Sequence, residues 1–215
     1  MASWVVSPGK FLAPDDVRRL RRVLSDAATL ARARGAQAAV RDQLIIELGL
    51  GTGLRVSEIS NLMVENLFLK KGQNSLHVRN GKGGKARIVQ FSAGLKKLIR
   101  AYLDYRKSGG DYLFPSQRNP KMTPSAIQQV FKRWAARAGL PKRYSIHSLR
   151  HTYATRLHKA SGYNLRLVQK QLGHSSVSTT QVYADMLDED VEKALANLDL
   201  EPGQIDTEAS FACNP

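Results

Sequence analysis

The sequence predicts a mainly α-helical protein of the α+β class with one small, three-stranded antiparallel sheet. Apolar residues recur every three or four positions over most of the 215 residues, which is the spacing of one helix face. Only residues 67–91 change to short β-type runs, and glycine-containing turns separate these runs. The length allows one sizeable core and at most two small domains.

The first helix is expected to begin at Pro14 and to end at the break at Gly35. Proline suits the first helical position, and the two acids after it suit the positive end of the helix dipole. The expected core face consists of Val17, Leu20, Leu24 and Leu30. A second helix should cover about residues 37–50, and Gly51-Thr-Gly53 ends it.

Three apolar runs, at residues 67–69, 76–78 and 88–91, are expected to form the antiparallel sheet. Lys71-Gly72 separates the first two runs, and the glycine-rich segment 80–85 separates the second and third. The sequence therefore predicts a hairpin that displays Lys82 and Lys85 at its tip. These lysines could protect an exposed sheet edge, or they could lie beside a phosphate.

Helices resume after the sheet. Ser92 is a plausible cap for one helix, and Thr123-Pro124 starts another after a loop over residues 107–122. Helix-like segments then run from His147 to Tyr183, and Gly173 ends one of them. An acidic amphipathic helix is expected at about 187–198, followed by a flexible acidic tail over residues 199–215.

The charge distribution points to a polyanion as partner. The chain carries 33 Lys+Arg and 18 Asp+Glu, a net charge of +15. From Asp185 onward there are nine acids and only one base, so the positive charge is concentrated in the preceding part. Nucleic acid is the usual partner of such a basic body. The alternative is a basic protein that charge merely keeps in solution.

Several classes are disfavoured by composition. No apolar run approaches the roughly 18 residues of a membrane span, and the N-terminus does not resemble a secretion signal. Cys213 is the only cysteine, so neither an internal disulfide nor a Cys/His metal cluster is expected. A reducing cytoplasm is the expected location, and no cofactor is expected.

Arg55 directly follows the glycine turn and starts a short helix that contains Ile59 and Leu62. A guanidinium matches phosphate oxygens, and free N–H groups at a helix start add to an anion site. The alternative is a surface pair between Arg55 and Glu58, three residues apart. His147 and Arg150 also share a helix face, although on this spacing alone a helix-start histidine and a solvent-exposed arginine are the more ordinary interpretation.

His174 follows Gly173, and Tyr183 lies on the next expected helix. Taken singly, a capping histidine and a half-buried tyrosine are the ordinary interpretations. Combined, the motifs are more specific. The pattern consists of Thr52-Gly-Leu-Arg55-Val-Ser-Glu58, Gly81-Lys82-Gly83, His147-Ser-Leu-Arg150-His151-Thr-Tyr-Ala-Thr155, and Leu172-Gly-His174 followed by Tyr183. On these residues the chain resembles the tyrosine recombinases, the family of phage integrases and Xer-type resolvases, over about residues 10–198.

The resemblance implies the catalytic fold of DNA breaking-rejoining enzymes and a site-specific recombinase that needs neither metal nor nucleotide. Tyr183 would attack a DNA phosphate and form a 3′-phosphotyrosyl link. Arg55 and Arg150 would hold the phosphate, and His147 would accept the phenol proton. Lys82 would protonate the leaving 5′ oxygen, with Lys85 as the alternative, and His174 would hydrogen-bond the phosphate.

The resemblance also implies partners. Double-stranded DNA is the expected substrate, with Lys85, Arg87, Lys142 and Arg143 as expected contacts. A tetramer on two DNA sites is expected, assembled through the C-terminal helix packing on a neighbour. The alternative is that this helix folds back on its own domain. The N-terminal core-binding domain of most family members is not expected, because the catalytic pattern begins by about residue 10.

Two rival functions stay open. A relaxing activity of the type IB topoisomerase kind uses the same chemistry without joining two sites. A non-catalytic DNA-binding protein would explain the charge, although all six candidate catalytic residues are present. The expected location within the cytoplasm is the nucleoid.

Overall fold

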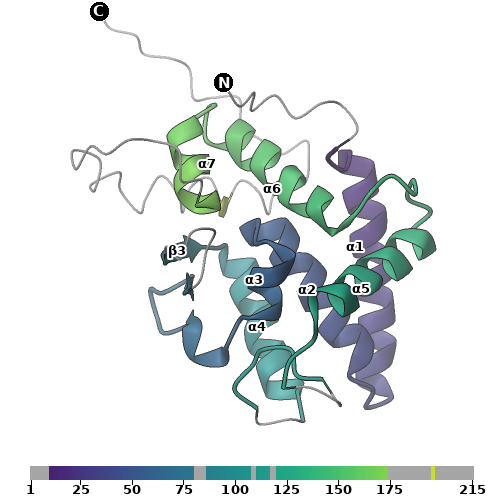
Figure 1. Ribbon diagram of the computed structural model, residues 1–215. Coiled ribbons are helices and arrows are strands. Elements are labelled where there is room, and N and C mark those ends of the chain that lie inside the picture. The colour runs from purple at the N-terminus through teal and green to yellow at the C-terminus, as the bar shows by residue number, and fades with distance from the viewer. Residues whose placement is uncertain (1–9, 80–85, 108–109, 117–119, 174–194, 197–215) are drawn as a thin grey trace, which may run out of the picture.

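The computed structural model describes residues 10–79, 86–107, 110–116, 120–173 and 195–196. It confirms the predicted fold class, a mainly helical body with one three-stranded antiparallel sheet (Figure 1). In chain order the elements are α1 (Pro14–Ala33), α2 (Ala38–Thr52), α3 (Val56–Ser60), the 3-10 helix η1 (Val64–Asn66), β1 (Leu67–Phe68), β2 (Ser75–Val78), β3 (Arg87–Gln90), α4 (Ala93–Tyr105), α5 (Pro124–Arg137), α6 (Ile146–Ala160) and α7 (Leu165–Leu172).

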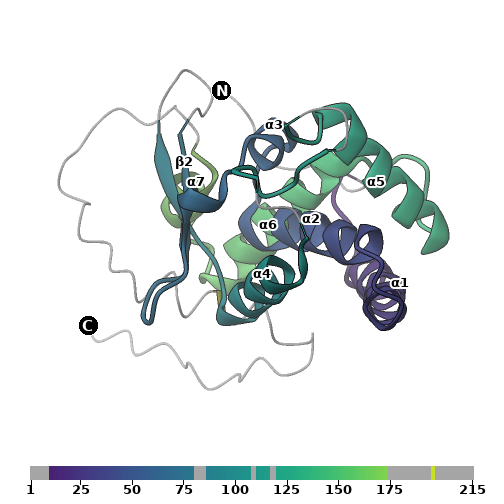
Figure 2. The ribbon, with the colours of Figure 1, turned by 90° about the horizontal axis from the view of Figure 1, so that it is seen from below.

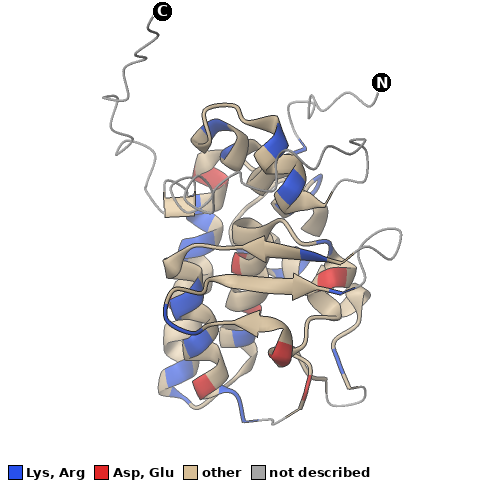
Figure 3. Cartoon of the chain, turned by 90° about the vertical axis from the view of Figure 1, so that its left-hand side faces the viewer, with Lys and Arg blue, Asp and Glu red and all other residues tan. Residues whose placement is uncertain are grey.

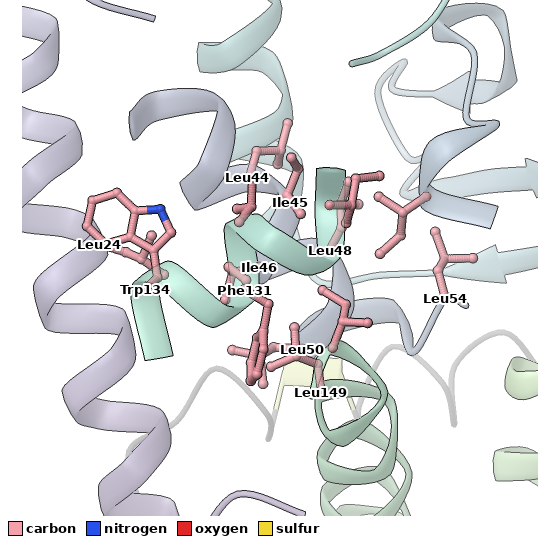
Figure 4. Close-up of a cluster of buried hydrophobic side chains, with 14 of the residues drawn as sticks. Leu24, Leu44, Ile45, Ile46, Leu48, Leu50, Leu54, Phe131, Trp134 and Leu149 are labelled. Carbon is pink, nitrogen blue, oxygen red and sulfur yellow. The ribbon is translucent and has the colours of Figure 1, made fainter. Parts of the chain in front are cut away.

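Helix α2 is the centre of the main core. Its consecutive residues Leu44, Ile45 and Ile46 are all buried, so no side of this helix turns wholly to solvent. A helix that is apolar all round must be surrounded, and α1, α4, α5 and α6 pack against it. Figure 4 shows its side chains between Leu24 of α1, Trp134 of α5 and Leu149 of α6.

The core face of α1 differs from the prediction at one residue. Val17, Leu20 and Leu24 are buried as expected, but Leu30 is 58% exposed. Six residues at about 100° each place Leu30 some 240° around the helix from Leu24. Ala28 and Ala31 complete the buried face instead. Similarly, α3 ends at Ser60, so Leu62 lies beyond it, although Leu62 is buried.

A close approach between α2 and α6 positions the two helices for the site described below. A Cβ on Gly49 would lie 2.8 Å from Leu149 Cδ1. Because real side chains do not pack that closely, glycine allows α6 to cross α2 at this point. The crossing brings Arg150, the residue after Leu149, towards the C-terminal end of α2.

The sheet has the strand order β1-β2-β3, and both pairings are antiparallel. Leu76 pairs with Val89, and both are buried on the face that covers the helices. Ile88 pairs with His77 on the other face and is 60% exposed. Figure 2 shows the sheet on one side of the molecule, with α7 close to it. The expected strands are confirmed to within one residue at most boundaries.

A second, smaller cluster lies between α6 and α7. It contains Tyr153, Leu157, Leu167, Val168, Leu172 and Leu195. Leu195 and Ala196 are helical and belong to the expected C-terminal helix. Leu195 is 2% exposed, so within one chain this side chain packs on its own α6 and α7. Among the residues that the structure describes, no helix is long and apolar enough to cross a membrane.

Candidate functional site

Hydrogen bonds bring four segments together: the turn between α2 and α3, the start of β3, the first turns of α6, and the C-terminal end of α7. Arg55, Arg87 and Arg150 come from three of these segments. Three guanidinium groups in one region need a compensating structure, because like charges repel one another. The contacts below describe that structure.

Arg55 occupies the cap position before α3, and Glu58 holds it from two directions. The Arg55 backbone N–H donates to Glu58 Oε2 at 2.8 Å, and Arg55 Nη1 donates to Oε1 at 2.9 Å. The predicted pair therefore exists, but it is not a surface pair, since the Glu58 side chain is only 3% exposed. The Arg55 side chain keeps 24% of its surface exposed. Part of its guanidinium is thus available to a ligand.

Arg150 is held by two backbone carbonyls. Its Nη1 donates to the oxygen of Gly53 at 2.5 Å, and its Nη2 donates to the oxygen of Leu172 at 2.9 Å. Gly53 lies two residues before Arg55, so the two arginines are neighbours although they are 95 positions apart in the chain. Gly53 is left-handed, with φ of 62°. A Cβ there would lie 2.4 Å from Tyr153 Cδ1, so the turn requires glycine.

The electrostatics of these groups are coupled. Burial lowers the pKa of Arg150 to about 10, and the positive charges of Arg55 and Arg87 add to this effect. Burial alone would raise the pKa of Glu58, but hydrogen bonds and charge from Arg87 and Arg55 bring that pKa below its usual value. At neutral pH Arg150 is therefore cationic and Glu58 is anionic.

Arg87 is turned into the protein. Its Nη1 and Nη2 donate to the two oxygens of Glu58 at 2.8 and 2.9 Å, and its Nε donates to the carbonyl of Gln171 at 3.3 Å. The side chain is 11% exposed. These contacts do not favour the expected role of Arg87 as a DNA contact, because its donors are directed to protein groups.

His147 lies in the first turn of α6 and is exposed, one turn before Arg150. The structure therefore places both on one end of the same helix, as the spacing predicts. His151, the neighbouring histidine, is half-buried, and burial together with the charges of Lys10, Arg150 and His147 lowers its pKa. A neutral His151 near three basic groups adds little charge to the site.

The remaining predicted residues are placed as follows. Lys82, Lys85, His174 and Tyr183 lie outside the described residues. Lys142 and Arg143 are exposed in the turn before α6, and the Arg143 guanidinium lies 5.1 Å from the centre of the Tyr144 ring. Figure 3 shows more Lys and Arg than Asp and Glu on the sheet side of the molecule. The described segments contain no group of three metal-binding side chains.

Sequence reasoning missed the internal roles of Glu58 and Arg87. Glu58 was visible only as a possible surface partner of Arg55. Arg87 carried a stronger signal, because it stands two residues before the buried Val89. Residues two apart in a strand share a face, so this spacing predicts that Arg87 points inward with Val89.

Chemically, the site presents two cationic forks whose positions are fixed by the backbone or by a buried carboxylate. Such forks fit the non-bridging oxygens of a phosphate and stabilise the charge that builds up when it is attacked. An exposed histidine one turn from Arg150 can exchange a proton with a bound group. The arrangement therefore suits transfer of a phosphoryl group carried by a large polyanion.

Comparison with known proteins shows the family to which the chain is related. Residues 10–190 match the Phage integrase family. Tyrosine recombinase XerA of Pyrococcus furiosus is 40% identical over 162 residues, which are 72% of this chain and 55% of that protein. Tyrosine recombinase XerC of Neisseria gonorrhoeae is 39% identical over 154 residues, 71% of this chain and 49% of that protein. The chain thus spans about half the length of these curated relatives.

Solved structures agree with the fold. The crystal structure of XerA recombinase matches with a TM-score of 0.64 and 31% identity, over 84% of this chain and 62% of that one. XerH recombinase bound to its difH substrate before cleavage matches with a TM-score of 0.64 and 26% identity, over 85% of this chain and 52% of that one.

Proposed function

The chain belongs to the phage integrase family, and from this membership and the geometry of the arginines we propose that it cleaves and rejoins DNA strands as a site-specific tyrosine recombinase. Double-stranded DNA is the proposed substrate. The net charge of the chain and the DNA-bound state of the similar XerH structure support this choice. No cofactor enters the proposed reaction.

One observation carries the proposal: Arg150 donates to the carbonyl of Gly53, two residues from Arg55. This bond makes neighbours of two motifs that are distant in the sequence. A scissile phosphate gripped by both guanidinium groups would be activated for attack, because the forks stabilise the additional negative charge of the transition state. Two neighbouring cations repel each other, so an arrangement that holds them side by side is better explained by an anionic ligand than by a purely structural role.

The proposed reaction has two balanced proton transfers. The Tyr183 oxygen bonds to phosphorus and its proton passes to His147, while the bond from phosphorus to the 5′ oxygen breaks. Lys82, or Lys85 in its place, gives a proton to that oxygen, and His174 hydrogen-bonds the phosphate. Phenol ordinarily ionises near pH 10, so nearby arginines are needed to favour the attacking phenolate. Rejoining reverses these steps with a new 5′-OH.

The decisive test uses a nicked suicide duplex, in which cleavage releases a short strand that diffuses away and leaves the covalent adduct trapped. Wild-type protein is incubated with a pool of such duplexes, and adducts are counted by denaturing electrophoresis and mapped by mass spectrometry. We expect an adduct on Tyr183, and none with Tyr183→Phe, which should still bind DNA. An undiminished adduct in that variant rejects Tyr183 as the nucleophile. Relaxation of supercoiled DNA without recombinant product would assign the topoisomerase-like activity instead.

We propose further that the active assembly is a tetramer on two DNA sites, held by exchange of the C-terminal helix. Leu195 supports a docking role for this helix, since its side chain is buried among Leu157, Leu167 and Leu172. The same apolar cluster on a neighbour would accept Leu195 equally well. The alternative is that the C-terminal helix stays on its own chain, with Leu195 packed on that chain's α6 and α7.

Deletion of residues 187–215 distinguishes the two arrangements. Under exchange, the truncated protein should bind one DNA half-site but lose cooperative assembly, as seen in gel shifts over a range of protein concentrations. Cooperative binding equal to that of the intact chain would favour the local arrangement.

A further inference from the structure

We propose that Arg87 is a positioning residue that fixes both phosphate-gripping arginines, through Glu58 on one side and the end of α7 on the other. The proposal rests on the function proposed above, and it assigns Arg87 no contact with DNA.

The contact with Glu58 is the first support. Arg87 and Arg55 share this one carboxylate, and Arg87 engages both of its oxygens. Two parallel hydrogen bonds fix the carboxylate plane, which a single point contact would not do. Since Glu58 in turn holds the Arg55 side chain and backbone N–H, the orientation of Arg55 depends on Arg87.

The second support lies at the end of α7. Arg87 Nε donates to the carbonyl of Gln171, and the next carbonyl, that of Leu172, accepts from Arg150. Arg150 also donates to Gly53, on the turn that leads to Arg55. These contacts form a closed ring through β3, α3, the α2–α3 turn, α6 and α7. In a closed ring, moving one member displaces the others.

Gly173 supplies an independent observation. It is left-handed, with φ of 65°, and ends α7. A Cβ on it would lie 2.5 Å from Arg87 Cδ and 2.8 Å from Arg87 Nε. The backbone of α7 therefore packs directly on the Arg87 side chain. The end of α7 is shaped around an arginine at this position.

Lysine cannot reproduce this arrangement. Its ammonium is a point charge on a flexible stem, and it cannot offer parallel donors to two carboxylate oxygens while a third reaches a carbonyl. The substitution Arg87→Lys therefore keeps the charge beside Glu58 but removes the fixed geometry. Arg87→Lys therefore distinguishes a role in fixing the geometry of Glu58 from a role in compensating its charge.

The test compares Arg87→Lys and Arg87→Met with wild type on the nicked duplex that wild type cleaves fastest. Three quantities are measured: the thermal midpoint, the Kd for DNA, and the single-turnover cleavage rate at saturating protein. We expect Arg87→Lys to fold, to bind DNA within about twofold of wild type, and to cleave about 100-fold more slowly, the cost of a small misplacement of catalytic groups. Arg87→Met should cleave no faster.

Arg21→Met is the matched control, because Arg21 also donates to both oxygens of one glutamate, Glu47, between α1 and α2. It should lower the thermal midpoint without slowing cleavage in the saturated complex. Gly173→Ala is a second probe, because the added Cβ would displace the Arg87 side chain while the left-handed backbone of Gly173 would be strained as well. We expect a similar loss of cleavage rate from it.

Each outcome is decisive. Arg87→Lys cleaving at the wild-type rate overturns the proposal. So does a weaker Kd with an unchanged rate at saturation, which would make Arg87 a DNA contact, and so does failure of Arg87→Lys to fold, which would make its role purely architectural. The absence of any wild-type adduct would instead count against the proposed function, and this result is distinguishable because it needs no variant.

Discussion

Arg150 Nη1 lies 2.5 Å from the carbonyl oxygen of Gly53. This hydrogen bond connects α6 to the turn between α2 and α3. It aims the guanidinium of Arg150 at the start of α3, where Arg55 stands. A backbone carbonyl can fix an arginine without neutralising it, so the cation stays available for a phosphate.

Arg150→Lys should therefore impair chemistry more than folding. A lysine cannot donate to the carbonyls of Gly53 and Leu172 while also presenting a fork to phosphate. We expect cleavage to fall by about 100-fold or more, the usual cost of losing one donor to a developing oxyanion. Single-turnover cleavage at saturating protein measures this, and DNA affinity is measured in parallel. Equal rates for the variant and wild type would contradict the proposed role of Arg150.

Gly53→Ala should lower the free energy of unfolding by more than the left-handed backbone conformation alone would explain. The left-handed backbone alone costs about 1–2 kcal/mol for a residue with a Cβ, and the contact with Tyr153 adds overpacking of about 1–3 kcal/mol. Gly35→Ala is the matched control, because Gly35 has a φ of 67° and a Cβ added there would meet nothing within 4 Å. Urea denaturation of both variants measures the difference. Equal losses would show that the packing at Gly53 is not tight.

Glu58 should give stability a specific pH dependence. Its folded pKa lies below the ordinary value of 4.5, so its ionised form stabilises the folded state at pH values above 4.5. That contribution is lost as the pH falls below 4.5 towards the folded pKa. We expect Glu58→Gln to be less stable than wild type by about 2 kcal/mol at neutral pH, with the difference narrowing on acidification.

Denaturation of wild type and Glu58→Gln over a pH series tests this expectation. Glu65→Gln is the control, because Glu65 pairs with Arg79 on the surface, where both side chains are 54% exposed. Exposed pairs contribute little, so this variant should follow wild type throughout. A difference at Glu58 that does not change with pH would argue against an ionised, hydrogen-bonded carboxylate.

Tyr153→Phe should leave the free energy of unfolding unchanged or raise it by about 1 kcal/mol, because a buried hydroxyl without a partner is costly. The Tyr153 side chain is fully buried, and its hydroxyl has no hydrogen-bond partner among the described residues. Tyr102→Phe is the contrasting control, since the Tyr102 hydroxyl donates to the carbonyl of Leu113 at 3.2 Å. That variant should lose about 1 kcal/mol. Thermal or urea denaturation of both proteins decides the comparison.

Much of the fold could be predicted because it depends on local signals. Pro14 and Gly35 bracket α1, Ser92 and Thr123 cap α4 and α5 through their side chains, and Gly173 ends α7 in the left-handed conformation. The prediction is wrong at Leu30, because six residues after Leu24 do not return to the same side of a helix. The rotation of the helix about its axis decides which residues face the core. Ala28 and Ala31 complete that face, but their small side chains give only a weak hydrophobic signal in the sequence.

The order of residues along the chain specified which groups are available for the chemistry: the arginines, the histidines and the glycine turns, each in its motif. It also determined the helices and strands on which they stand, because capping, periodicity and turn chemistry act over a few residues. The hydrogen bond from Arg150 to the carbonyl of Gly53 and the inward turn of Arg87 to Glu58 arise from packing between distant segments. Those contacts depend on how α6 crosses α2 at Gly49 and on how α7 packs beside β3, and such packing is set by side chains distant in the chain.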